Sequence, residues 1–385
     1  MRTLLRSSLI LLLVWLLPIT GGAQTFAIPP TFDYAGPFSE GLAHVLIGRK
    51  RAFIDKTGKV VIDASRFDSV YPFSEGYARV VLDGKWGYID RQGDLAIDLR
   101  FRDASDFKEG FATVSFDPQS IGNLVLGKSN KGLINKAGRV VVNPYLNSIF
   151  PFSDGYAVVN FGALGDPTVG VMNRDGRITV PARYEFITRF SGGLAAALTS
   201  KNGWGIIRPD GSWHIAPRFD FLSDFSEGLS VFADCAGRVH KPYDFRRNDN
   251  NCRLGYIDTE GVIKIPAQFV DASPFRESRA IVTFNRGDIK NTPLFATPKD
   301  AFFGFIDKSG ALVVDPIYNE ISDYSNGVAR VRHPSVKEAD GGWGFIDLWG
   351  KPVTPFKFLA AEKFSEGLAS VQLPSGKWGY ISLNR

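Results

Sequence analysis

The chain has 385 residues, 22% of them charged, and a formal net charge of +5 at pH 7. The basic residues are spread along the chain, which excludes the clustered basic face of a nucleic-acid-binding protein. The two cysteines, Cys235 and Cys252, lack the paired spacing of a zinc site, and no metal or cofactor is expected.

Residues 1–23 have the pattern of a secretory signal peptide, with two arginines, an apolar run, a proline and small residues in that order (Arg2, Arg6, Leu9–Leu17, Pro18, Gly21, Gly22 and Ala23). The alternative is an uncleaved anchor, but the run is far shorter than the roughly 20 apolar residues of a membrane-spanning helix. We therefore expect export through the Sec pathway, cleavage after Ala23, and a mature chain of residues 24–385, periplasmic or extracellular, without a membrane span.

The stretch from Phe73 to Ile97, FSEGYARVVLDGKWGYIDRQGDLAI, appears nine times with variations. Each copy begins with an aromatic residue that we call the anchor aromatic: Phe38, Phe73, Phe107, Phe152, Phe190, Phe225, Phe275, Tyr324 and Phe364. Short alternating or β-branched runs such as Tyr77–Val80 predict strands. Self-similarity at this period predicts an all-β array in which each of nine units supplies three or four strands.

The two ends of the array complement each other. Residues 26–38 match the tail of an internal repeat, whereas the last unit stops at Arg385 without that tail. Such an offset is expected where the first strand completes the last unit of a closed, propeller-like ring. The alternative is an open β-superhelix, because nine units exceed the usual four to eight blades of a propeller.

Each unit has a turn and a glycine inside a strand. An Asp-x-x-Gly segment such as Asp90–Gly93 predicts a hairpin turn and not a metal site, because Asp bonds nearby amides and Gly adopts positive φ. The glycine of Trp86-Gly87, which we call the strand glycine, predicts close approach by another backbone, for which we expect the next repeat.

Two further positions recur around the anchor aromatic. A second aromatic lies six residues before it in every unit except that of Leu146, and burial of such pairs, at about 1.5–3 kcal/mol per side chain, predicts the core. The acid two residues after it, as in Glu75, is absent at Gly192 and Asn326. We interpret this anchor acid as a solvated turn residue or a cap, not as a catalytic carboxylate.

These motifs, F-S-E-G-[LY]-A-x-V followed by G-K-W-G-[YF]-I-D-x-x-G, resemble the WG (KWG) repeat family of mainly bacterial proteins. The resemblance covers nearly all of residues 24–385, although five units lack the tryptophan. It implies a non-enzymatic repeat array and implies little about a specific activity.

Extra length falls mainly between the second and third strands of a unit, at Ser115–Ser129, Ala233–Arg253, Asn285–Ala301 and Pro334–Gly341. Insertions at equivalent positions emerge on the same side of an array, which is commonly its binding face. Three of them belong to units six, seven and eight and predict one patch. Since each neighbouring unit supplies its own strands, truncation of Ala233–Arg253 is expected to leave the fold intact.

The insertion of unit six is basic and aromatic. An exported chain favours a disulfide between Cys235 and Cys252, which would stabilise by about 3 kcal/mol on the chain-entropy model. Arginine and aromatic residues are frequent anchors of interfaces. The predicted binding residues are Arg238, Lys241, Tyr243, Phe245, Arg246, Arg247 and Arg253, joined by Arg286 and Phe295 of unit seven.

These features favour a non-enzymatic exported scaffold that binds a protein, a wall polymer or another anionic surface. One alternative is a structural component of the envelope. Another is a hydrolase with carboxylates from several units, although the four histidines, His44, His214, His240 and His333, lie in four different units and no catalytic motif is present.

Overall fold

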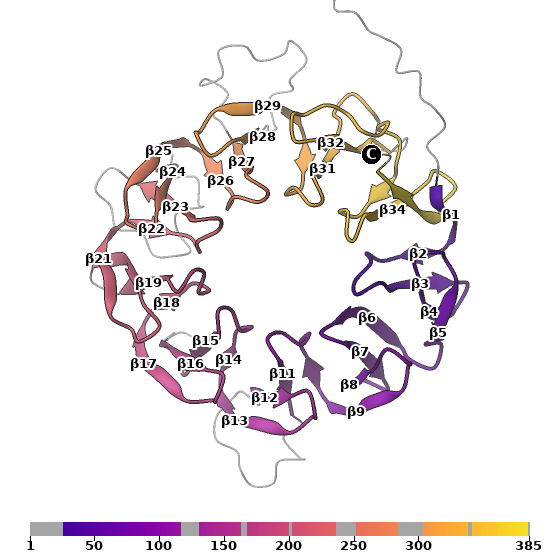
Figure 1. Cartoon of the computed structure of the whole chain (residues 1–385), viewed down its shortest axis with the longest axis horizontal. Helices are drawn as coiled ribbons and strands as arrows, with labels where there is room; N and C mark the ends of the chain where they lie inside the picture. The colour runs from indigo at the N-terminus through magenta and orange to yellow at the C-terminus, as the bar shows by residue number, and fades with distance from the viewer. Residues whose placement is uncertain are drawn as a thin grey trace, which may run out of the picture.

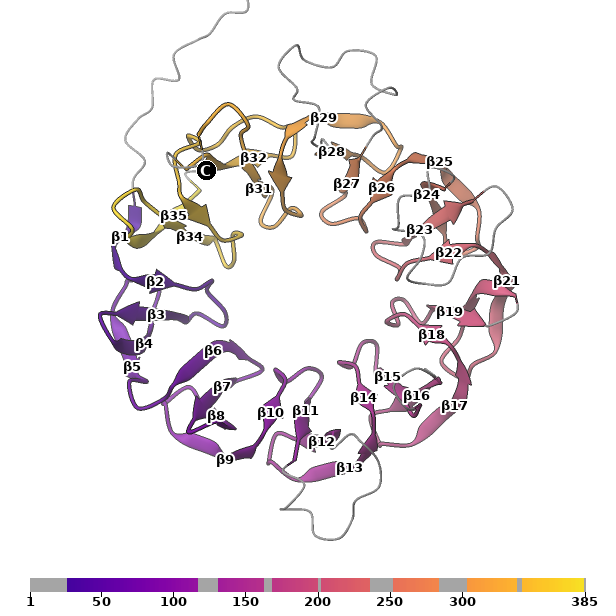
Figure 2. The same ribbon diagram turned by 180° about the vertical axis from the view of Figure 1, so that it is seen from behind.

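The computed structural model describes residues 26–116, 131–162, 168–199, 202–235, 252–283, 303–337 and 341–383. These residues form nine small antiparallel sheets and contain no helix. The sheets follow one another around a closed ring, seen along its axis from the two sides in Figures 1 and 2. The protein is a nine-bladed β-propeller, which confirms the predicted all-β class and the number of units.

The strands run through the blades in chain order. Blade 1 holds β2 (Tyr34–Ala35), β3 (Ala43–Ile47), β4 (Lys50–Ile54) and β5 (Val60–Asp63); blade 2 holds β6 (Ser69–Ser74), β7 (Tyr77–Leu82), β8 (Lys85–Ile89) and β9 (Leu95–Phe101). Blade 3 holds β10 (Asp103–Ala104), β11 (Phe111–Ser115), β12 (Lys131–Asn135) and β13 (Val140–Leu146); blade 4 holds β14 (Ser148–Ile149), β15 (Tyr156–Asn160), β16 (Val169–Asn173) and β17 (Ile178–Tyr184).

Blades 5 to 7 repeat this order. Blade 5 holds β18 (Phe186–Ile187), β19 (Ala195–Thr199), β20 (Gly203–Ile207) and β21 (Trp213–Phe219); blade 6 holds β22 (Phe221–Leu222), β23 (Leu229–Asp234), β24 (Arg253–Asp258) and β25 (Ile263–Phe269). Blade 7 holds β26 (Asp271–Ala272), β27 (Ala280–Thr283), β28 (Phe303–Ile306) and β29 (Leu312–Tyr318). In each of blades 1 to 7 the first strand lies innermost and the fourth lies at the rim (Figure 1).

Blade 8 departs from this pattern. It holds β30 (Glu320–Ile321), β31 (Val328–Arg332) and β32 (Trp343–Asp347), and no fourth strand follows among its described residues. Pro352 interrupts the segment that would form it, at a position where β25 of blade 6 has Ile263, and proline cannot donate to a strand ladder. The hydroxyl of Thr354 instead accepts a hydrogen bond from the Phe345 N–H at 2.9 Å, and only isolated bridges remain.

Blade 9 closes the ring. It holds β33 (Ala360–Ala361), β34 (Leu368–Gln372) and β35 (Trp378–Ser382), and its fourth strand is β1 (Phe26–Phe32) from the other end of the chain. β1 pairs with β35 from Phe26↔Ile381 to Phe32↔Trp378. The predicted completion of the last unit by the first strand is therefore confirmed, and the open superhelix is excluded.

The core lies between neighbouring blades. Each of the nine anchor aromatics is buried, at 4% exposure or less. The ring of Tyr88 in blade 2 packs against the anchor aromatic Phe107 of blade 3, with ring centroids 4.8 Å apart, and Tyr380 packs likewise against Phe38. The second aromatics are also buried, except Phe219, which is half-buried. The anchor aromatic thus holds one blade to the next, and the prediction that both aromatics of a unit belong to the core is confirmed for the buried pairs.

The strand glycine meets a different neighbour from the one expected. A Cβ on Gly87 would lie 2.6 Å from the carbonyl oxygen of Ile97, which belongs to β9 of the same blade. The prediction that the next repeat lies there was wrong. A bulge in the β8–β9 pairing brings the fourth strand over the glycine. In blade 1, where Ala52 replaces the glycine, β4 and β5 pair differently, with Ala52 opposite Asp63.

The predicted Asp-x-x-Gly turns are confirmed. The carboxylate of Asp90 accepts hydrogen bonds from the Gln92 and Asp94 amides at 2.9 and 3.0 Å, and the turn glycine Gly93 has a φ of 87°. Gly93 also sits against Ile62 of the preceding blade. The turn therefore shapes a hairpin and fits it against its neighbour.

Candidate functional site

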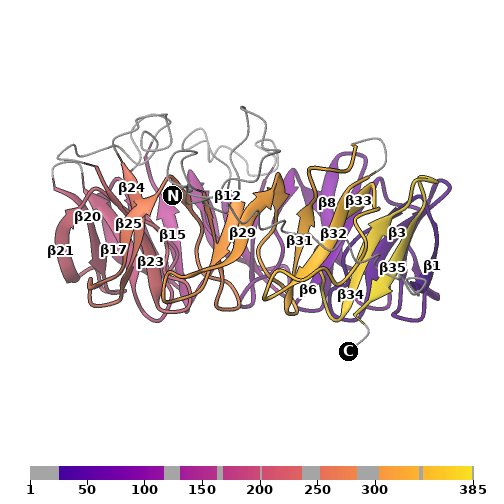
Figure 3. The same ribbon diagram turned by 90° about the horizontal axis from the view of Figure 1, so that it is seen from above.

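The connections between second and third strands leave every blade at the same face. The strand pairs at their borders are the last of each ladder, namely Ile47↔Lys50, Leu82↔Lys85, Ser115↔Lys131, Asn160↔Val169, Thr199↔Gly203, Asp234↔Arg253, Thr283↔Phe303, Arg332↔Trp343 and Gln372↔Trp378. Since the blades repeat around one axis, these borders share a face, opposite the Asp-x-x-Gly turns (Figure 3). We call it the connection face.

A disulfide lies at the base of the blade 6 connection. Cys235 and Cys252 are bonded, with Cα atoms 4.0 Å apart, as the sequence predicts. Both are buried in the core that blades 6 and 7 share, at 1% and 8% exposure. The carboxylate of Asp220 accepts a hydrogen bond from the Cys235 amide at 3.1 Å. The two ends of the connection are therefore fixed to the blade.

These contacts correct the expected truncation limits. Ala233 and Asp234 belong to β23, and Arg253 and Leu254, their partners, belong to β24. Removing Ala233–Arg253 would therefore delete paired strand residues and two buried cysteines. The segment that can be shortened without touching the ladder is 236–251.

Most of the predicted binding residues lie outside the described residues: Arg238, Lys241, Tyr243, Phe245, Arg246, Arg247, Arg286 and Phe295. The predicted signal peptide, residues 1–23, lies outside them as well. Arg253 is described and is half-buried at the start of β24, where its guanidinium donates to the Cys252 carbonyl at 3.1 Å. Arg253 therefore lies at the base of the blade 6 connection, beside the disulfide.

The described histidines, His44, His214 and His333, are far apart in the chain and lie in three different blades. His44 of blade 1 packs between the rings of Tyr34 and Phe53, and burial lowers its pKa from 6.5 to about 4. His214 contacts Arg208 at 2.8 Å, and His333 contacts Ser335 at 2.7 Å. Within the described ranges no group of three or more His, Cys, Asp or Glu side chains could hold a metal ion.

The anchor acids form a belt on the face opposite the connection face. Glu40, Glu75 and their equivalents have φ near +50°, and each accepts hydrogen bonds from backbone amides in the corresponding turn of the next blade. The acceptor–amide pairs are Glu40–Gly76, Glu75–Gly110, Glu109–Gly155, Asp154–Gly193, Glu227–Ser278, Glu277–Gly327, Asn326–Gly367 and Glu366–Gly41. The interpretation of this acid as a cap is confirmed. We call this feature the turn belt.

Cations reinforce the turn belt. In five blades the residue after the turn aspartate or asparagine pairs with the anchor acid of the preceding blade: Lys56–Glu366, Arg91–Glu40, Lys136–Glu75, Arg174–Glu109 and Lys308–Glu227. Partial burial acts to raise the pKa of Glu75, but hydrogen bonds from Gly110 and Lys136 lower it overall. The described anchor acids are thus occupied in structural contacts.

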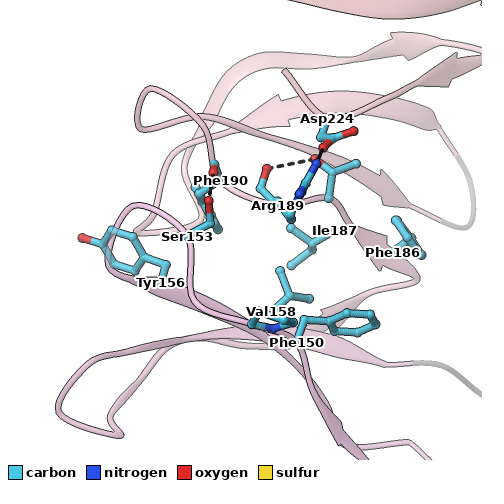
Figure 4. A pocket seen from close by; sticks show the side chains of 11 residues that line it. Phe150, Ser153, Tyr156, Val158, Phe186, Ile187, Arg189, Phe190 and Asp224 are labelled. Carbon is cyan, nitrogen blue, oxygen red and sulfur yellow. Dashed lines mark hydrogen bonds and ion pairs between the residues drawn. The ribbon is translucent and has the colours of Figure 1, made fainter. Parts of the chain in front are cut away.

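A pocket of about 320 Å³ lies between blades 4 and 5, and the sequence analysis did not find it. It is lined by Phe150, Pro151, Ser153, Tyr156, Val158, Phe186, Ile187, Thr188, Arg189, Phe190 and Asp224. Arg189 and Asp224 form an ion pair on one side of it, and Phe150 and Val158 lie on the other (Figure 4). The sequence contains no signal that singles out this pocket: Val158 stands where blade 2 has Arg79, but blade 6 also has a valine, Val231, at that position.

No helix within the described residues is long and apolar enough to cross a membrane. A comparison with curated proteins found no match. Among solved structures, the chain is similar to one described as a crystal structure of the eukaryotic initiation factor, with 9% identity, a TM-score of 0.54, and coverage of 90% of this chain and 93% of that one. Another match is BamB from Moraxella catarrhalis, at 9% identity, a TM-score of 0.32 and 65% and 81% coverage.

The first of these likenesses bears on the fold alone. The family model described as "WG containing repeat" matches nine segments of the chain: 24–50, 52–86, 86–117, 132–163, 170–201, 204–233, 255–286, 303–333 and 343–381. These segments equal the blades in number and cover most of the sequence, and a segment such as 255–286 runs from β24 and β25 of blade 6 to β26 and β27 of blade 7. The chain belongs to the family of WG repeat proteins.

Proposed function

We propose that this protein is a non-enzymatic, exported scaffold that binds an anionic partner through the connection face of blades 6 to 8. The observation that carries the proposal is the common origin of three long connections. Residues 235–252, 284–302 and 333–342 join paired strands of three successive blades at one face.

The chemistry of these connections supports an anionic partner. Residues 236–251 include Arg238, Lys241, Arg246 and Arg247 together with aromatic side chains, and 284–302 adds Arg286, Lys290 and Lys299. Arginine and aromatic residues are over-represented among the energetically dominant positions of interfaces. The partner chemistry that fits is an acidic protein surface or an anionic envelope polymer.

The buried disulfide supports export. Disulfides persist in oxidising compartments and are rare in the cytosol. Closing the 17-residue separation between Cys235 and Cys252 also restricts the ends of the connection, which lowers the entropy that a partner must remove on binding. An anchored connection of this kind suits a binding role.

The test replaces residues 236–251 by Asn-Gly and leaves the disulfide in place. Blade 2 provides the model, because its Leu82↔Lys85 pair is joined by the two-residue turn Asp83-Gly84. A matched control shortens 117–130 of blade 3, which starts from the same face far from blade 6. We expect the first variant to fold and to lose an anionic partner that the control retains. Equal retention of the partner by both variants would contradict the proposal.

A further inference from the structure

In two places an arginine of this chain fills the space between neighbouring blades. The middle residue of the second strand faces the next blade, and in blade 2 this residue is Arg79. Its guanidinium lies 4.3 Å from the ring centroid of Tyr71 and donates to the Ala104 carbonyl of blade 3 at 2.9 Å. Its Nε also donates to Asp106 at 2.6 Å. The Tyr71 ring of blade 2 and the Ala104 carbonyl and Asp106 carboxylate of blade 3 thus form a binding site for an arginine side chain, which we call a receptor.

Blade 8 repeats this arrangement. Arg330 occupies the same position in β31, lies 4.6 Å from the ring centroid of Trp343 and donates to the Ala361 carbonyl of blade 9. Glu362 lies 3.8 Å away and supplies the negative charge. An aromatic face, a carbonyl on the inner strand and a carboxylate are therefore the shared components of the two receptors.

Between blades 4 and 5 the receptor is present and the arginine is not. Val158 takes the place of Arg79, since both lie opposite the residue that follows the strand glycine. Phe150 takes the place of Tyr71, two residues before the anchor aromatic, and is 44% exposed. The carbonyl of Ile187 takes the place of that of Ala104, because the pairs Ile187↔Ala197 and Ala104↔Val114 have the same register.

The charges around this pocket are compatible with a cation. Arg189 stands where Asp106 stands in blade 3, but it is ion-paired with Asp224, which also lines the pocket. In blade 9 the corresponding residue is Lys363, and Arg330 still occupies the space beside it. A cation at this position therefore does not exclude a guanidinium, and Asp224 supplies the carboxylate that the other two receptors contain.

We propose that the pocket between blades 4 and 5 binds the side chain of an arginine from a partner protein. The guanidinium stacks on Phe150 and donates to the Ile187 carbonyl, while Asp224 shares its charge between Arg189 and the guest. This site is independent of the long connections of blades 6 to 8, so a variant of one leaves the other unchanged.

The first experiment titrates the mature protein with acetyl-Gly-Arg-Gly-amide by NMR or calorimetry, beside peptides that carry citrulline, lysine or glutamate instead of arginine. We expect saturable binding of the arginine peptide at one site and at least tenfold weaker binding of the citrulline peptide, because citrulline has the shape of arginine without its charge. Equal binding of these two peptides, preference for the glutamate peptide, or no binding of any would overturn the proposal.

Variants then locate the site. Val158→Arg supplies the side chain from within, as Arg79 does, and is expected to abolish binding while the melting temperature is kept or raised. Phe150→Ala removes the stacking face and should weaken binding about tenfold. If Val158→Arg does not fold, the affinity of Phe150→Ala for the arginine peptide still tests the proposal. Unchanged affinity in Phe150→Ala would overturn the assignment.

A gain-of-site control uses the arginine-filled interface. Arg79→Val empties the receptor of blade 3, with Asp106 and Ala104 left in place, and should add a second site for the arginine peptide. Binding to Arg79→Val together with none to the wild type would show that only the blade 3 receptor is competent, and would contradict the proposal for blades 4 and 5.

Discussion

The carboxylate of Glu75 in blade 2 accepts a hydrogen bond at 2.8 Å from the backbone amide of Gly110, in the corresponding turn of blade 3. A second amide of that turn, from Glu109, donates to the same carboxylate. This contact explains why an acid is retained where the backbone has a positive φ, which side chains other than glycine adopt at a cost. The turn belt is therefore an inter-blade device.

Removing one member of the turn belt should weaken the ring. Glu75→Ala loses both amide bonds and the contact with Lys136 at 3.3 Å, and because the site is partly exposed we expect a loss of about 1–2 kcal/mol. Glu75→Gln keeps one acceptor oxygen, so its free energy of unfolding should lie between those of the wild type and of Glu75→Ala. Denaturant unfolding measures the difference, and an unchanged midpoint in Glu75→Ala would contradict the assigned role.

Completing the turn belt should strengthen it. Gly192 stands at the acid position of blade 5 and provides no carboxylate for blade 6, and Thr259 stands where five other blades have a basic residue. Gly192 already has a φ of 60°, as the glutamates of other blades do. The double variant Gly192→Glu, Thr259→Lys should raise the melting temperature above that of Thr259→Lys alone. A decrease would show that this turn differs from its counterparts.

His44 should make stability depend on pH. Its pKa in the folded protein is lowered to about 4, so between pH 4 and 6.5 the unfolded chain binds the extra proton and the folded chain does not. Stability is then full above about pH 6.5 and falls as the pH drops toward 4, by up to about 3 kcal/mol. His44→Phe should flatten this slope in thermal melts, whereas an equal slope in both proteins would assign the effect to other groups.

The strand glycine should be intolerant of a side chain. Gly87→Ala places a methyl group 2.6 Å from the Ile97 carbonyl oxygen and should cost about 1–3 kcal/mol through displacement of β9. Ala52→Gly in blade 1, where Ala52 pairs directly with Asp63, should change stability by about 1 kcal/mol or less. Similar losses in the two variants would mean that glycine flexibility, and not the carbonyl contact, governs the position.

The repeat pattern predicted most of the fold because its signals are local. The anchor aromatics, the Asp-x-x-Gly turns and the offset between the chain ends each act within one unit or between successive units. The offset is what predicted that β1 would complete the blade of β35. The disulfide followed from the count and spacing of Cys235 and Cys252 in a chain expected to be exported.

The features that sequence reasoning missed depend on register between strands. The neighbour of Gly87 is set by a bulge, which a repeat pattern does not encode. The loss of the fourth strand in blade 8 coincides with Pro352, whose effect appears only once the strand is placed. The pocket between blades 4 and 5 is lined by residues of three successive units, such as Val158, Arg189 and Asp224, whose proximity is known only once the blades are placed.

The measurement that tests the central claim most directly is affinity capture from an envelope extract. The mature chain is compared with a variant in which Tyr243, Phe245, Arg246 and Arg247 are changed to Ala, and with a control in which four exposed cations that follow turn glycines on the opposite face, Lys59, Arg139, Arg177 and Lys351, are changed to Ala. We predict that the first two differ, with the partner held by the mature chain and by the control and lost by the blade 6 variant. Equal capture by the mature chain and the blade 6 variant would contradict binding through the connection face.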